Sequence, residues 1–155
     1  MQHKPQSIKV IVDTNIVFSA LLSPKGKIAD IIFDSANSFA FYSCSYMRLE
    51  INEHWNKLRK ISKLTDDELD EARSLLFSRI QFLNEELIPE KTWIFAEKLT
   101  ADIDVDDLVF GALTRHLDGL LWSGDKRLLK GLSRKGFENT ITTNELYSLL
   151  ETKDE

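Results

Sequence analysis

Short apolar runs alternate along the chain with stretches whose apolar residues recur every three or four positions. The run at 8–12 (IKVIV) is apolar at four of its five positions, which is typical of a strand covered on both faces. We predict further strands at 39–44, 86–89, 120–122 and 138–142. The helical spacing predicts helices at 16–22, 27–36, 45–59, 65–83, 90–99, 105–117, 126–132 and 144–150.

Two of the predicted helices carry recognisable start signals. Ser45 is a predicted N-cap, and Thr65 with Glu68 makes the Thr-x-x-Glu pattern of a capping box. Strands and helices alternate throughout the chain, and the connection between parallel strands is right-handed in nearly all proteins. We therefore predict an α/β fold, a three-layer sandwich with a central, mainly parallel sheet and helices on both faces.

Composition indicates one globular domain. The chain is 43% hydrophobic and 29% charged with 6 Gly and 3 Pro, which excludes disordered and collagen-like proteins. No apolar run approaches the roughly 20 residues that span a bilayer, and no secretory signal is recognisable. The single cysteine, Cys44, suits a reducing cytoplasm. We expect a cytoplasmic single domain at 1–155, with its core at about 8–150 and short tails at 1–7 and 151–155.

Acidic residues follow the strands in a way that suggests a shared site. The net charge of −5 counts against general electrostatic binding of nucleic acid, unless the acids are concentrated for a chemical reason. Asp13 follows the first predicted strand, and Asp125 follows the fourth. Asp104 and Asp107 share a face of a first helical turn, and Glu50 lies early in the helix after the second strand. Ligands gather at the carboxyl ends of such strands, and all-oxygen sites suit Mg²⁺ or Mn²⁺, as one or two ions.

Other chemistries have little support. His3, His54 and His116 are scattered and form no zinc-binding pattern, and Cys44 lies in an apolar strand, as a small core residue would. The sequence has no nucleophile elbow and no glycine-rich phosphate loop. Taken singly, most of these acids could be helix caps, turn residues or surface charges. Asp13 is harder to explain in that way, because a carboxylate at the end of a buried strand needs a partner.

The order of these acids resembles that of the PIN-domain family, which includes VapC-like metal-dependent ribonucleases. The residues that carry the resemblance are VIVDTN at 10–15, the segment 46–51 with Glu50, and DIDVDDLVFGALTRHLDGLLWSGD at 102–125. It extends over about residues 8–145. It implies catalytic and metal-binding roles for Asp13, Glu50, Asp107 and Asp125, Asp104 as an additional metal ligand, and Asn15 and Ser123 as supporting polar groups.

Two positions within this set remain open. Glu53 lies one helical turn from Glu50 and could take its place. Asp106 could likewise replace Asp107, although Asp107 shares a face with Asp104.

The resemblance implies a metal-dependent endoribonuclease that hydrolyses RNA phosphodiester bonds and serves as the toxin of a type II toxin–antitoxin pair. A cognate antitoxin and a homodimer are then expected partners, and a membrane is not. The alternative is a stand-alone RNA-processing or RNA-decay nuclease, and a receiver-like signalling domain or a non-catalytic binding module ranks lower. A dehalogenase-like phosphatase would need an aspartate where Asn15 stands. The residues expected to contact the RNA backbone are Lys25, Lys27, Lys126, Arg127 and Lys130.

Overall fold

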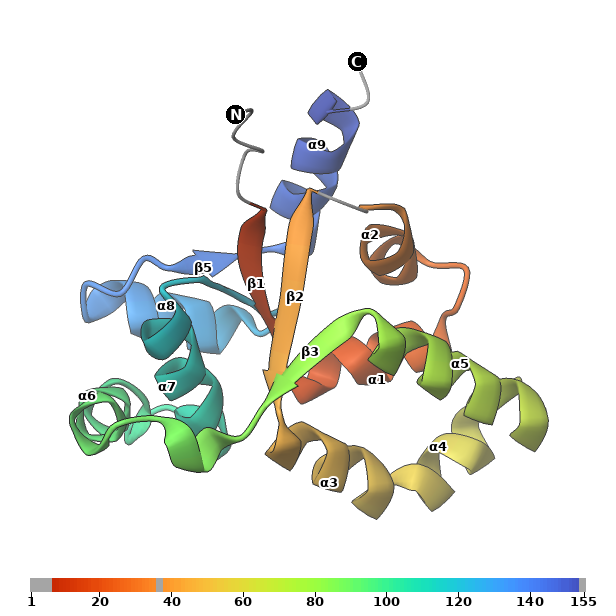
Figure 1. Ribbon diagram of the computed structural model, residues 1–155, viewed down its shortest axis with the longest axis horizontal. Helices are drawn as coiled ribbons and strands as arrows, with labels where there is room; N and C mark the ends of the chain where they lie inside the picture. Colours follow the sequence, from red (N-terminus) through yellow and green to blue (C-terminus); the bar gives the residue numbers. More distant parts are fainter. Residues whose placement is uncertain (1–6, 36–37, 154–155) are drawn as a thin grey trace, which may run out of the picture.

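A parallel five-stranded sheet forms the centre of the computed structural model, which describes residues 7–35 and 38–153 (Figure 1). The order of the strands is β3-β2-β1-β4-β5, and each neighbouring pair is parallel. This arrangement confirms the predicted α/β class. The strands are β1 (Ile8–Val12), β2 (Phe39–Cys44), β3 (Ile80–Leu83), β4 (Leu120–Trp122) and β5 (Thr140–Ile141).

Helices cover both faces of this sheet, as predicted. In Figure 1, α6, α7 and α8 lie on one side of β1 and β2, and α1 and α2 lie on the other. The bounds are α1 (Thr14–Leu22), α2 (Lys27–Asp34), α3 (Ser45–Glu53), α4 (Trp55–Ile61), α5 (Asp66–Ser78), α6 (Glu90–Thr100), α7 (Leu108–Leu117), α8 (Lys126–Arg134) and α9 (Thr143–Lys153), with the 3₁₀ turns η1 (Glu85–Leu87) and η2 (Val105–Asp107). None of the helices in the described ranges has the length and apolar character needed to cross a membrane.

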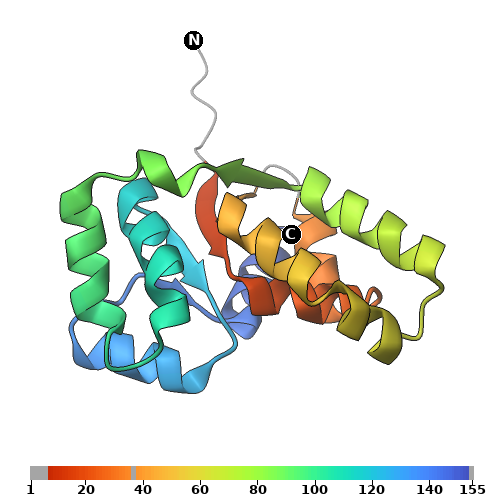
Figure 2. The ribbon, with the colours of Figure 1, turned by 90° about the horizontal axis from the view of Figure 1, so that it is seen from below.

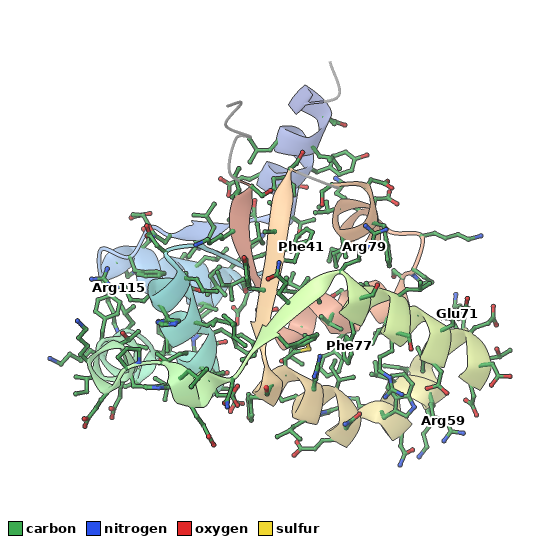
Figure 3. All side chains as sticks on the ribbon, viewed as in Figure 1. Phe41, Arg59, Glu71, Phe77, Arg79 and Arg115 are labelled. Atoms are coloured by element: carbon green, nitrogen blue, oxygen red, sulfur yellow. The ribbon has the colours of Figure 1, made fainter. Side chains whose placement is uncertain are left out.

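The core follows from the central position of β1. This strand pairs with β2 on one side and with β4 on the other, and Val10, Ile11 and Val12 are fully buried. Phe41 of β2 packs on Trp122 of β4 with ring centroids 6.0 Å apart, and Figure 3 shows Phe41 in the crowded centre while Arg59 and Glu71 lie at the periphery. Residues 10–12 of β1 are therefore buried on both faces, while Lys9 is exposed, and this burial holds the residue after the strand in a fixed position.

Gly119, the residue before β4, allows that strand to lie close against β1. A Cβ atom at position 119 would contact Cδ1 of Ile11 and come within 2.9 Å of the carbonyl oxygen of Lys9. The backbone of a central strand cannot move away easily, so we expect Gly119→Ala to destabilise the fold by about 1–3 kcal/mol. Urea unfolding checks this, with Gly124→Ala as the control, because a Cβ there meets no atom within 4 Å.

The predictions about two of the helices have different outcomes in the structure. The capping box is confirmed: the Thr65 hydroxyl accepts from the Glu68 amide, and the Glu68 carboxylate accepts from the Thr65 amide. The single helix predicted at 45–59 is wrong, because α3 ends at Glu53 and α4 begins at Trp55. The predicted N-cap at Ser45 is also wrong, because Cys44 is the N-cap of α3 and Ser45 is its first residue.

The third strand is also misplaced in the prediction. Residues 80–83 pair with β2 as β3, in the register Phe41↔Ile80, whereas the predicted strand at 86–89 contains part of η1. Ile80 and Leu83 continue the three- and four-residue spacing of the preceding helix, so sequence spacing alone assigns them to it. The edge of β2 needs backbone partners, and pairing there extends the sheet.

The chain ends fall partly outside the described residues. Of the predicted tails, 1–6 and 154–155 lie outside, and 151–153 continue α9. The helix predicted at 27–36 ends at Asp34, and position 36 lies outside the described residues.

Candidate functional site

A small acidic cleft lies where β1 and β4 end and the following helices begin. Its volume is about 130 Å³. The chain reaches it from four separate segments, at the starts of α1 and α8, in α3, and in the turn before α7. The lining residues are Asp13, Thr14, Asn15, Glu50, Asp104, Asp106, Asp107, Phe110 and Asp125. All five acids assigned to a metal site from the sequence therefore line one cleft.

Asp13 is the most buried of these acids, with 5% of its surface exposed. It is the N-cap of α1, and its Oδ1 accepts a hydrogen bond of 2.9 Å from the Ile16 amide. Burial raises the pKa of Asp13 to about 6, and the nearby charges of Asp125 and Glu50 add to the rise, while the hydrogen bonds from Ile16 and Ser123 oppose it. The strand thus holds a carboxylate where negative charge is unfavourable.

Glu50 faces this cleft, and Glu53 does not line it. The Thr14 hydroxyl donates a 2.6 Å hydrogen bond to Oε1 of Glu50, which ties α3 to the start of α1. Burial raises the pKa of Glu50, and the charge of Asp106 contributes further. Glu53 is exposed one turn away. Thr14 was missed by the sequence reasoning, although a hydroxyl directly after a buried acid is a usable signal.

The turn before α7 brings three aspartates to the cleft. The predicted helix start at 105 is the 3₁₀ turn η2, and Oδ1 of Asp104 accepts a 2.9 Å hydrogen bond from the Asp106 amide. Asp107 is partly buried, and this burial, with the charges of Asp104, Asp13 and Asp125, raises its pKa to about 7. Asp106 is exposed and lines the cleft from its rim. The structure therefore places Asp107 deeper than Asp106, and both contribute charge.

Asp125 is held at the cleft by the start of α8. Its Oδ1 accepts hydrogen bonds from the Arg127 amide at 3.0 Å and the Leu128 amide at 3.2 Å. The Asp125 amide donates to the hydroxyl of buried Ser123 at 3.1 Å. Ser123 also hydrogen-bonds Asp13, so it links the two strand ends. Ser123 therefore contacts two of the acids that line the cleft.

The donor chemistry of the cleft fits a hard divalent cation. Its charged lining consists of carboxylates, and within the described residues neither Lys nor Arg lines it. In the described part of the chain, however, no three Asp, Glu, His or Cys side chains are already grouped so as to hold a metal ion together. Several of these carboxylates are turned toward backbone amides or hydroxyls instead. The donors suit Mg²⁺ or Mn²⁺ in kind, and binding requires the side chains to turn toward one another.

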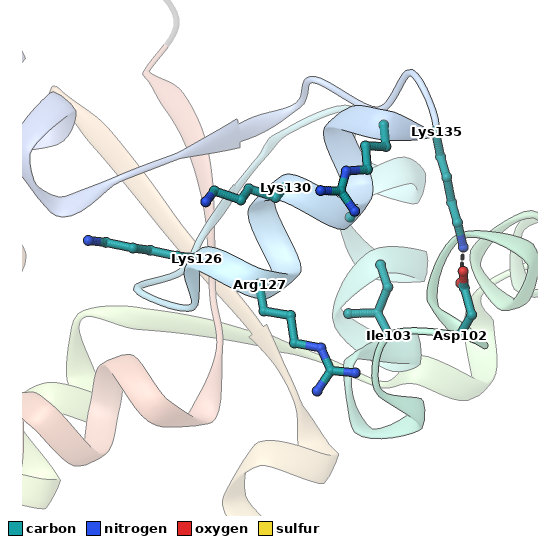
Figure 4. Close-up of a pocket in the computed structure, with 8 residues that line it drawn as sticks. Asp102, Ile103, Lys126, Arg127, Lys130 and Lys135 are labelled. Atoms are coloured by element: carbon teal, nitrogen blue, oxygen red, sulfur yellow. Dashed lines mark hydrogen bonds and ion pairs between the residues drawn. The ribbon is translucent and has the colours of Figure 1, made fainter.

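A basic pocket lies along α8, the helix that is capped by Asp125 of the acidic cleft (Figure 4). It has a volume of about 530 Å³ between α8 and the loop after α6. Lys135 pairs with Asp102 across it. Sequence reasoning missed Arg134 and Lys135, although positions 126, 130 and 134 recur at the four-residue spacing of one helix face. The lining residues are Asp102, Ile103, Lys126, Arg127, Lys130, Gly131, Arg134 and Lys135.

The structure does not bring Lys25 and Lys27 to either pocket. The ammonium group of Lys27 donates to Oδ1 of Asn144 at 3.3 Å and lies 4.8 Å from the centre of the Tyr147 ring. Lys27 thus contacts α9, and Lys25 lies in the turn before α2. Of the five predicted backbone contacts, Lys126, Arg127 and Lys130 lie beside the acidic cleft.

Comparisons with known proteins agree with this architecture. One solved chain that matches comes from the structure of VapBC2 from Rickettsia felis bound to a DNA fragment from its promoter. The two chains are 13% identical with a TM-score of 0.65, and the match covers 87% of this chain and 98% of that one. PAE2754 from Pyrobaculum aerophilum is 12% identical, with a TM-score of 0.64 and coverage of 94% and 96%. At these identities the likeness is one of fold, and no curated protein matches. A family model described as the PIN domain matches residues 11–147, and the chain therefore belongs to the PIN domain family.

Proposed function

We propose that this protein is a metal-dependent endoribonuclease whose acidic cleft is the catalytic centre. The observation that carries the proposal is the convergence of carboxylates from four segments on one cleft that no described Lys or Arg lines. Membership of the PIN domain family supports it, because PIN domains are nucleases. Buried Asp13 and partly buried Asp107, whose pKa values are raised to about 6 and about 7, support it further.

The residues proposed to hold Mg²⁺ or Mn²⁺ are Asp13, Glu50, Asp104, Asp107 and Asp125. A bound divalent ion supplies an activated water and neutralises charge on the phosphate and the leaving oxygen. The chain contributes orientation: Ile16 and Ser123 fix Asp13, and Thr14 fixes Glu50. Asp125 is held in the same way by the first amides of α8. A fixed donor set lowers the cost of arranging charge around the scissile phosphate.

Cleavage assays test the proposal directly. Structured and unstructured RNA are incubated with the protein in Mg²⁺, Mn²⁺ or EDTA. We expect internal cleavage with either ion and none in EDTA. Glu50→Gln should lose most of this activity, whereas Glu53→Gln, one turn away and outside the cleft, should retain it. Equal activity of the two variants would contradict the placement of the site.

The basic residues beside the cleft are proposed to bind the phosphates that flank the cut. Replacing Lys126, Arg127 and Lys130 together with Ala should weaken binding about equally for all RNA sequences. The slope of log affinity against log salt should fall by about 0.7 per lost contact on single-stranded RNA, or about 2 in total. Fluorescence anisotropy at several salt concentrations measures this slope. Replacing Lys25 and Lys27 with Ala is the control, and it should leave the slope unchanged.

We further propose that the protein acts in the cytoplasm as the toxin of a toxin–antitoxin pair. Its likeness in fold to VapBC2, solved with promoter DNA, supports this role over a stand-alone RNA-processing or RNA-decay enzyme. The test is controlled expression with and without the neighbouring reading frame. Growth arrest by the wild type, absent with Asp13→Asn and relieved by the neighbour, is expected. Continued growth with active wild-type enzyme would favour the stand-alone role. Size-exclusion chromatography tests the proposed homodimer.

A further inference from the structure

A second pocket adjoins the acidic cleft on the side away from α8. It has a volume of about 260 Å³ and is formed by the starts of α3 and α7, by η1 and by α6. In Figure 2 the connection that contains η1 runs from β3 past α3 to α6. Asp106 lines both this pocket and the acidic cleft, so the two lie next to each other. The lining residues are Tyr46, Glu85, Trp93, Asp106, Leu108 and Val109.

Two aromatic side chains, Tyr46 and Trp93, line this pocket. Tyr46 and Trp93 are each partly exposed and pack against the core from its edge. Of the other tryptophans, Trp122 contacts Phe41, and Trp55 lies beneath the guanidinium of Arg73. Among the described residues, no second ring and no cation stacks on Trp93. A planar ligand that stacks on the exposed part of Trp93 would therefore displace neither a ring nor a cation.

Glu85 lines the same pocket and carries an unsatisfied acceptor. Its Oε2 atom is buried and accepts no hydrogen bond from any described residue. Buried acceptors are nearly always paired, and leaving a charged one unpaired is costly. No Lys or Arg of the described chain lines the pocket, and Asp106 adds a second negative charge. If the Glu85 side chain turns so that this buried oxygen faces the pocket, the pocket suits a neutral, flat molecule that donates hydrogen bonds, and it disfavours a phosphate.

We infer that this pocket is a base-recognition subsite for guanine, in an RNA whose scissile phosphate lies at the acidic cleft. Single-stranded RNA is read by aromatic stacking and by hydrogen bonds to the base edges. On its Watson–Crick edge, guanine carries two adjacent N–H donors, and both can hydrogen-bond to one carboxylate. Adenine and cytosine pair one amino group with an acceptor nitrogen, and the single N–H of uracil lies between two carbonyl oxygens. The inference rests on the proposed nuclease function.

The two pockets beside the acidic cleft would then bind different parts of the RNA. The pocket on α8 is cationic and suits phosphates, whereas the pocket at Trp93 is aromatic and anionic and suits a base. An RNA strand that crosses the acidic cleft would have its backbone held on one side and one base read on the other. Phosphate contacts set position, and base contacts set sequence.

Mapping the cut ends of a mixed-sequence RNA tests the inference in the active enzyme. We expect guanine to be enriched at one fixed position beside the cut. Replacing that guanine with inosine removes the 2-amino donor and should slow cleavage about tenfold, the usual effect of one charged hydrogen bond. In Glu85→Gln this inosine effect should largely disappear. Glu86→Gln, an exposed neighbour on η1, is the matched control and should keep it.

A binding measurement gives a readout that does not depend on cleavage. Tryptophan fluorescence is followed in EDTA while short oligouridine RNAs, with or without one guanine, are added to the protein. We expect stronger quenching with the guanine-containing strand, loss of the difference in Glu85→Gln, and a smaller signal in Trp93→Phe. Equal quenching by both strands, or no quenching, would overturn the subsite.

The two proposals fail in different ways. If the wild type cuts RNA without preference for guanine, or if Glu85→Gln keeps the same preference, the subsite is wrong and the nuclease function stands. If no RNA is cut but guanine-dependent quenching occurs, the subsite stands as a binding site and the nuclease function fails.

Discussion

Asp13→Asn and Asp107→Asn, each made singly, are expected to reduce RNA cleavage by at least about 10–100-fold while the fold is retained. Loss of a partner that only orients a metal ligand costs about 10–100-fold, so loss of a ligand should cost at least as much. In Asp13→Asn the amide oxygen of the introduced side chain can still accept the hydrogen bond from the Ile16 amide, so the cap of α1 should survive. Initial rates in Mn²⁺ and circular dichroism measure the two effects.

Asp102→Asn is the matched control for these variants. Asp102 lies two residues before Asp104, but it is exposed, pairs with Lys135 and does not line the acidic cleft. We expect this variant to change the rate only a few-fold. A large loss in Asp102→Asn, or near-normal cleavage by Asp13→Asn, would contradict the assignment of the catalytic residues.

Asp13→Asn should also make the metal-free protein more stable at alkaline pH. The pKa of Asp13 is raised from 3.8 to about 6, so the folded state holds its proton more tightly than the unfolded state does. The stabilisation from this proton is complete below about pH 4 and is lost as the pH rises through about 6. Because each unit of pKa shift corresponds to about 1.4 kcal/mol, the gain at pH 8 should be about 1–3 kcal/mol.

Urea unfolding in EDTA at about pH 4.5 and about pH 8 measures this gain. The wild type should lose stability between the two pH values, and Asp107, whose pKa is raised to about 7, acts in the same direction. Asp13→Asn should reduce the loss and show a smaller advantage at the lower pH, because Asp13 begins to ionise in the unfolded state near pH 3.8. If the wild type is equally stable at both pH values, ionisation of Asp13 and Asp107 does not destabilise the folded state, contrary to the prediction.

The fold class and the grouping of the acids could be predicted from the sequence because simple geometric rules govern both. The run at 8–12 is too apolar for a strand with one solvent-exposed face, and this indicates a central parallel strand. In a parallel sheet the residues after neighbouring strands meet at one edge, so Asp13 and Asp125 could be placed together before the structure was known. These predictions needed only the order of the elements.

The errors arise where local spacing and tertiary pairing disagree. Ile80 and Leu83 fit the helical spacing of the preceding residues, but in the structure they pair with β2 and form β3. The pattern at 45–59 likewise hides the break at His54, whose backbone ψ of 8° leaves the helical range. Helix propensity is a weak guide at such positions, since packing decides the outcome.

Features that depend on distant segments were out of reach of sequence reasoning. Lys135 meets Asp102 only because α8 ends beside the loop after α6. The pocket with Glu85 and Trp93 is formed by elements whose positions depend on β3, and β3 was misplaced. The unpaired Oε2 atom of Glu85 has no signature in the sequence at all.

The most direct test of the central claim, that the acidic cleft binds a divalent cation, is a set of paired thermal melts of the wild type and Asp13→Asn. Each protein is melted in EDTA and in Mg²⁺ or Mn²⁺ at a pH above the raised pKa values of Asp13 and Asp107. An ion at about ten times its dissociation constant should stabilise the wild type by about 1.4 kcal/mol, which raises its melting temperature by about 3–5 °C. Asp13→Asn should lose most of this increase. An unchanged wild type, or an equal increase in the variant, would contradict the claim and leave Asp13 as a structural carboxylate.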